Sequence, residues 1–164
     1  MKLKQRTSII VLLLTIFTFT CHAEETSVFD RLGAQLTVKD GKVKALLEGC
    51  PLYTDKEFVM KSRPRQLSLT RYILAHFDGA KVRCEREGVA FLLALVDPNS
   101  QEQTKNTLAF VEANQWNPVQ EIHEFSLYYT NGADRPAKVY WKQIAQGAEI
   151  QIPKGSILCF RYKP

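Results

Sequence analysis

The most constraining feature is an uninterrupted apolar run at residues 89–96, which reads Val-Ala-Phe-Leu-Leu-Ala-Leu-Val. A short run with no polar position is typical of a strand whose two faces are both covered. It therefore predicts a central strand of a sheet. The preceding residues 81–85 predict a second strand, and Arg86-Glu87-Gly88 between the two indicates a hairpin.

The last third of the chain has the same β character. After a break at residues 114–118, runs of strand-forming residues alternate with turn residues such as Asn131-Gly132 and Pro153-Lys154-Gly155. Long stretches with a 3.6-residue period are absent, which argues against a helical bundle. The pattern predicts a mainly β fold, an antiparallel β-sandwich or small barrel-like domain with room for one short helix. The runs are residues 119–130, 137–144, 148–152 and 156–163.

Three further segments carry local signals. Residues 36–38 and 43–47 flank Asp40-Gly41, a pair that favours a tight hairpin turn. Residues 66–77 fit either helix or strand, and their β-branched and aromatic content favours strand. Residues 100–113 stay open: Ser100 and Gln103 could form a capping box for a helix, whereas residues 107–111 are equally good strand material.

The N-terminus predicts an export signal. Lys2, Lys4 and Arg6 precede an apolar or hydroxylic run of 12 residues at 9–20, followed by Cys21-His22-Ala23. A membrane-spanning helix needs about 20 apolar residues, so the run suits a signal peptide better than an anchor. We expect residues 1–23 to be a cleaved signal peptide, residues 24–164 to be a single β-rich globular domain, and the location to be periplasmic or secreted.

Lipidation at Cys21 is not expected, because Thr18, Phe19 and Thr20 replace the small residue and the leucine that normally precede an acceptor cysteine.

Cleavage changes the net charge of the chain. The leader holds three of the 22 basic residues and none of the 17 acidic ones, which leaves the mature chain with a net charge of +2. The chain also has no run of basic residues with aromatic residues between them. This absence and the small net charge argue against nucleic acid as a partner.

Three cysteines remain after cleavage, at positions 50, 84 and 159. In an oxidising compartment at least one pair is expected to bond. We predict a disulfide between Cys50 and Cys84, and we expect Cys159, within the apolar run 157–160, to behave as a small buried hydrophobe. The other pairings stay open, because spacing does not determine connectivity.

No catalytic, metal or cofactor motif is present. His76 and His123 are the histidines of the mature chain, and neither has a partner at a zinc-ligand spacing. Glu121 and Glu124 lie near His123, but a surface histidine beside solvated carboxylates is the simpler interpretation. The chain lacks a Gly-x-Ser-x-Gly elbow and a glycine-rich phosphate loop. We therefore predict no catalytic residue, no metal and no cofactor.

Aromatic residues crowd the C-terminal third, where they suit either a contact surface or core packing. On a strand, Tyr140 and Trp141 point to opposite faces, so one of the two can be exposed. The candidate binding residues are Trp116, Tyr128, Tyr140, Trp141 and Tyr162.

A small exported β domain without a catalytic signature predicts a non-enzymatic module that binds another protein. An inhibitor or immunity protein against a secreted toxin is one form, and a component of a secretion or fimbrial apparatus is another. Two alternatives stay open. One is a small cell-wall or glycan hydrolase with paired carboxylates, and the other is a carbohydrate-binding sandwich that uses the aromatics as a stacking platform.

Overall fold

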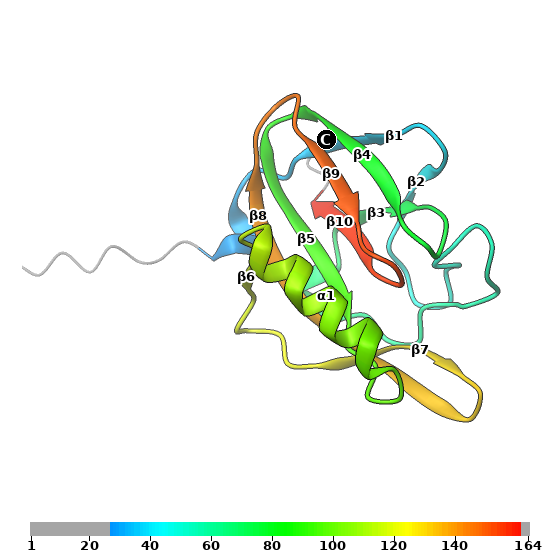
Figure 1. Cartoon of the computed structure of the whole chain (residues 1–164). Coiled ribbons are helices and arrows are strands. Elements are labelled where there is room, and N and C mark those ends of the chain that lie inside the picture. Colours follow the sequence, from blue (N-terminus) through cyan, green and yellow to red (C-terminus); the bar gives the residue numbers. More distant parts are fainter. Residues whose placement is uncertain (1–26, 162–164) are drawn as a thin grey trace, which may run out of the picture.

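The structure of the protein is a computed structural model that describes residues 27–161. The predicted signal peptide and Tyr162 lie outside the described residues. The fold is a mainly β sandwich of two antiparallel sheets and one α-helix within the described residues, α1 (Gln101–Ala113) (Figure 1). The predicted fold class is therefore confirmed.

The smaller sheet has the order β1-β4-β9, and the larger has the order β2-β3-β10-β5-β8-β6, with β7 also paired to β8. One short 3-10 turn, η1, precedes β1, and a second, η2, lies between β2 and β3. The bounds are β1 (Gln35–Val38), β2 (Lys42–Ala45), β3 (Thr70–Leu74), β4 (Ala80–Arg86), β5 (Gly88–Leu95), β6 (Asn117–Pro118), β7 (Phe125–Thr130), β8 (Ala133–Ile144), β9 (Glu149–Ile152), β10 (Ile157–Arg161), η1 (Val28–Asp30) and η2 (Arg65–Leu67).

Strand β5 explains the apolar run. It lies between β10 and β8, and all eight of its residues are buried. Side chains alternate along a strand, so Phe91 and Leu93 enter one hydrophobic cluster, the first core, while Ala90 and Leu92 enter another, the second core. The run is continuous because each face of the strand has its own core.

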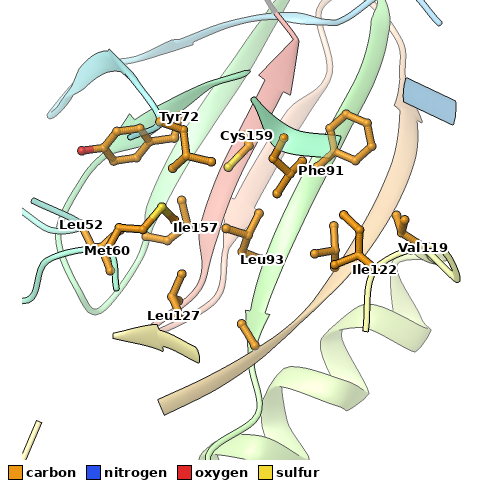
Figure 2. Packing of buried hydrophobic residues seen from close by; sticks show 14 of the residues in the cluster. Leu52, Met60, Tyr72, Phe91, Leu93, Val119, Ile122, Leu127, Ile157 and Cys159 are labelled. Atoms are coloured by element: carbon orange, nitrogen blue, oxygen red, sulfur yellow. The ribbon is translucent and has the colours of Figure 1, made fainter. Parts of the chain in front are cut away.

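Different layers cover these two cores. Figure 2 shows Phe91 and Leu93 packed beside Cys159 and Ile157 of β10 in the first core. Loop residues such as Leu52 close this core from outside. The second core takes its residues from the smaller sheet, from the inner face of the larger one, and from α1 and the segment that follows it.

The two predicted hairpins do not pair as expected. β1 pairs with β4 and β2 with β3, so the segments flanking Asp40-Gly41 belong to different sheets. Likewise β4 pairs with β9, whereas β5 pairs with β8 and β10. Both turns are corners at which the chain passes from one sheet to the other. At Gly88 a Cβ atom would lie 2.4 Å from the Ala34 nitrogen, so only glycine permits this close approach.

The ambiguous segments are resolved by their surroundings. The preference for a strand at residues 66–77 is confirmed for β3 (Thr70–Leu74), whereas the segment begins in the 3-10 turn η2. Within the open segment 100–113, residues 101–113 form α1. Ser100 is the N-cap residue, but its side chain makes no capping hydrogen bond. A true hairpin joins β7 and β8 at Asn131 and Gly132, which both have positive φ, as such two-residue turns require.

Among residues 27–161, no helix is both long enough and apolar enough to cross a membrane.

Candidate binding site

The predicted aromatic residues separate into buried and accessible ones. Trp116 (6% exposed) packs in the second core and Tyr128 (2% exposed) in the first, where Tyr128 stacks on Phe58 at 4.5 Å between ring centroids. Tyr140 and Trp141 on β8 are only partly buried. Trp116 and Tyr128 are therefore packed in the cores, and little of either side chain reaches the surface.

Trp141 forms the wall of a surface hollow of about 530 Å³, which we call the Trp141 hollow. Three separate segments meet there: the η1 region, the stretch after β6, and β8. The pairing of Asn117 with Trp141 brings the second segment to the third. The hollow is lined by Ser27, Val28, Arg31, Pro118, Gln120, Glu121 and Trp141. Its size falls in the range of about 300–1,000 Å³ that is usual for ligand sites.

Arg31 lies over the indole of Trp141. Its guanidinium carbon is 4.8 Å from the ring centroid, while the indole also packs against the first core. This cation–π contact contributes only about 0.5–1 kcal/mol at an exposed site. Arg31 is in none of the salt bridges formed among residues 27–161.

Glu121 faces the same hollow from the opposite segment. Its backbone carbonyl accepts a hydrogen bond of 3.0 Å from the Gln66 side-chain amide, which anchors the segment. Its exposed carboxylate makes no ion pair with any residue of the described range. Arg31 and Glu121 thus line one hollow with opposite charges and form no salt bridge with each other, which leaves their hydrogen-bonding groups available.

The N-terminal wall is held by the core. The ring of Phe29 stacks on Phe91 with centroids 5.1 Å apart and an interplanar angle of 12°. The Arg161 guanidinium also donates a hydrogen bond to the Phe29 carbonyl. These two contacts fix η1, and therefore the backbone that carries Arg31.

A smaller hollow of about 220 Å³ adjoins the first at Pro118 and Gln120. Tyr140 and His123 line it, beside an ion pair of 4.0 Å between Lys138 and Glu124. Partial burial raises the pKa of Tyr140 above its usual value. In the part of the chain that the structure describes, no group of three or more histidine, cysteine or acidic residues is arranged to hold a metal.

Carboxylates are distributed singly among the hollows. Each of four surface hollows of residues 27–161 is lined by one acidic side chain, and the two that adjoin at Pro118 and Gln120 contribute Glu121 and Glu124. The four acidic residues are Glu102, Glu121, Glu124 and Glu149.

The predicted disulfide between Cys50 and Cys84 is not formed. All three cysteines of the described residues are free. Cys50 packs against the first core and Cys84 lies in the second, so the larger sheet separates them. Cys159 belongs to the first core, against which Cys50 packs, and burial followed by the charge of Cys50 raises the pKa of Cys159. The prediction that Cys159 is a buried thiol is confirmed.

Alkylation of the native protein should modify Cys50 first, because Cys50 is only partly buried whereas Cys84 and Cys159 are fully enclosed. Thiolate formation and access control such reactions, and burial raises the pKa of both enclosed thiols. Peptide mapping by mass spectrometry, with and without denaturant, measures the order. A Cys50→Ser variant should show no rapid labelling. A non-reduced peptide that links Cys50 to Cys84 would contradict the structure.

Together these features define a β-sandwich with an aromatic-walled surface hollow that carries both charges. No protein-family model matches the chain, and no curated protein matches it either. Among solved structures it is similar to a glycoside hydrolase family 138 enzyme targeting pectin rhamnogalacturonan II, with a TM-score of 0.52 and 10% identity over 80% of this chain. It is also similar to a beta-glucuronidase from glycoside hydrolase family 2, with a TM-score of 0.48 and 12% identity over 78% of this chain.

The chain spans only 16% and 14% of the length of those two proteins. At such low identity the likeness to the family 138 enzyme shows the sandwich fold alone.

Proposed function

We propose that the protein is a non-enzymatic binding module whose Trp141 hollow takes a sugar unit of a glycan. One observation carries this proposal: the Trp141 indole is flanked by Arg31 and Glu121, whose charged groups do not pair with each other. This function was one of the alternatives that the sequence left open.

The chemistry of a sugar suits this arrangement. A pyranose has an apolar face that packs on an aromatic ring and a rim of hydroxyls that both donate and accept hydrogen bonds. Arg31 supplies donors only, the Glu121 carboxylate is an acceptor, and Gln120 and Ser27 offer both. An apolar wall with a few polar groups that set orientation is the usual composition of a ligand site.

A ligand that stacks on Trp141 has to share the ring with Arg31 or displace it. The cation–π contact is worth only about 0.5–1 kcal/mol at the surface, so the guanidinium can move at little cost. Once moved, its planar donors can bind hydroxyl or carboxylate oxygens of the ligand. The Trp141 indole is then covered by the Arg31 guanidinium in the free protein and by the ligand in the complex.

The burial of Trp116 and Tyr128 favours this function over a broad aromatic surface for a protein partner. None of the four hollows described above is lined by two carboxylates, so the hydrolase alternative gains no support from them. A periplasmic or secreted location, which the leader predicts, would place the module where cell-wall and extracellular glycans occur.

Replacement of Trp141 by alanine should weaken glycan binding about 30-fold, which corresponds to about 2 kcal/mol for the loss of a central aromatic contact. An array of neutral and acidic oligosaccharides identifies the ligand, and calorimetry then compares the variants. Arg31→Ala and Glu121→Gln should cause smaller losses.

The matched control is Tyr129→Ala, which removes an aromatic ring that is 57% exposed on β7 and lies outside the hollow. This variant should keep full affinity. Retention of no oligosaccharide by the array, or equal affinity of the wild type and Trp141→Ala, would rule out the proposal.

A further inference from the structure

The free edge of β2 is a second surface with unused binding capacity. β2 is a terminal strand of the larger sheet, and β3 is its one pairing partner among the strands that the structure describes. All four of its residues are exposed, and no strand within residues 27–161 covers its other side. Figure 1 shows β2 at the margin of the molecule, just after the corner that leads from β1.

The register determines which backbone groups face outward. The Leu46 nitrogen donates to the Thr70 carbonyl at 3.0 Å, so the N–H of Leu46 points toward the strand β3. These directions alternate along an antiparallel strand. The N–H and C=O groups of Val43 and Ala45 therefore point to the open side, where an added strand would bind them.

The side chains of this edge differ between the two faces. Val43 (38% exposed) and Leu47 (53% exposed) share one face, and Leu69 (63% exposed) lies across from Leu47 where the register continues. Lys42 and Lys44 occupy the other face. The edge thus combines one face with three exposed apolar side chains, next to Arg71 of β3, and a second face with the two lysines.

The two lysines are not neutralised by their neighbours. Lys42 and Lys44 form no salt bridge with any residue in the described range 27–161. Glu48, the nearest carboxylate after the strand, accepts a hydrogen bond from the Arg63 backbone at 3.1 Å. A partner strand would therefore meet two free positive charges.

We propose that the β2 edge binds an extended segment of another protein, in which apolar and acidic residues alternate. Backbone groups of Val43 and Ala45 would hold the added strand, as in other cases of strand addition to a sheet edge. The apolar positions would pack on Val43, Leu47 and Leu69, and the acidic ones would pair with the lysines.

Two features of the edge distinguish this occupant from its alternatives. A second copy paired through β2 would bring like-charged lysines close together, which is unfavourable for strand pairing. Short strands with lysines are also a way of preventing edge pairing, yet a purely protective edge does not need leucines that are 53% and 63% exposed beside it.

The test uses two fluorescent ten-residue peptides, one alternating valine with glutamate and one alternating valine with lysine. The glutamate peptide should bind saturably, with amide chemical-shift changes along β2, and the lysine peptide should not bind. The double variant Lys42→Glu with Lys44→Glu reverses both charges of the edge. It should bind the lysine peptide and no longer the glutamate peptide.

Ala45→Pro is the sharpest variant. It removes one outward N–H but no hydrogen bond to β3, and proline is tolerated on an edge whose N–H faces solvent. Peptide affinity should fall about tenfold or more, as expected for a lost hydrogen bond and a steric block. Lys105→Glu, an exposed charge reversal on α1, is the control for a single lysine reversal on β2 and should leave binding unchanged.

The proposal would be overturned if neither peptide bound saturably or if both bound with equal affinity. It would also be overturned if the Ala45→Pro variant and the double variant Lys42→Glu with Lys44→Glu both bound the glutamate peptide with full affinity. Self-association through β2, seen by light scattering and abolished by Ala45→Pro, would overturn it in favour of a second copy. Binding of glycans at Trp141 is measured separately, so either result stands without the other.

Discussion

Replacement of Phe91 by alanine is expected to lower the free energy of unfolding by about 4 kcal/mol. Phe91 is 1% exposed at the centre of β5 and stacks on Phe29. Truncation of a buried phenylalanine costs about 3–5 kcal/mol, because transfer energy is lost and a cavity remains. Domains are typically stable by about 5–15 kcal/mol, so this single change removes a large share of the total.

The same substitution should also weaken ligand binding. Phe91 lies opposite Trp141 in the β5–β8 register, and through Phe29 it holds the segment that carries Arg31. Loss of this contact would loosen two walls of the Trp141 hollow. Phe91→Leu, which keeps most of the volume, should cost much less stability and preserve more affinity.

Urea unfolding followed by circular dichroism measures the stability of these variants. Val43→Ala is the control, because Val43 is 38% exposed on an edge strand and should change stability by less than about 1 kcal/mol. A loss below about 1.5 kcal/mol for Phe91→Ala would mean that the first core is not packed around this ring.

Replacement of Arg135 by methionine should cost about 3 kcal/mol. The Arg135 guanidinium lies 3.0 Å from a carboxylate oxygen of Asp97, and the two side chains are only 13% and 10% exposed. Removing one partner of a buried ion pair leaves the other charge without compensation, which destabilises a protein by about 3–5 kcal/mol.

Asp97 makes this pair important for the start of α1. Its carboxylate also accepts a hydrogen bond of 2.9 Å from the Asn99 nitrogen, and its carbonyl accepts one of 2.8 Å from the Thr104 hydroxyl. The ion pair therefore ties β8 to the turn that begins the helix. The double variant Arg135→Met with Asp97→Asn should recover part of the lost stability, because no buried charge is then left alone.

A double-mutant cycle from thermal and urea unfolding measures this coupling. The control is Lys61→Met, which breaks the ion pair of 2.5 Å between Lys61 and Asp134, whose side chains are 47% and 53% exposed. Exposed pairs contribute about 0–1 kcal/mol, so this change should be small. Strictly additive losses for Arg135 and Asp97 would show that the two side chains do not interact.

Part of the candidate site could be predicted from the sequence. Trp141 of the Trp141 hollow and Tyr140 of the smaller hollow could be named because tyrosine and tryptophan are common at binding surfaces and alternate along β8. Arg31 and Glu121 could not, since residues 31, 121 and 141 are far apart in the sequence. Their meeting depends on the pairing of β6 with β8 and on the stacking of Phe29.

The amino-acid sequence by itself determined the β-rich class, most of the strand segments and the central place of β5, because side-chain periodicity and continuous apolar runs are local properties of the chain. Only the tertiary structure decided which strands pair, which aromatics are buried and which thiols are neighbours. Local sequence predicts hairpin turns at Asp40-Gly41 and at Arg86-Glu87-Gly88. In the structure, each of these turns leads from one sheet to the other. Burial depends on the layer that covers a strand, and that layer comes from residues distant in the chain.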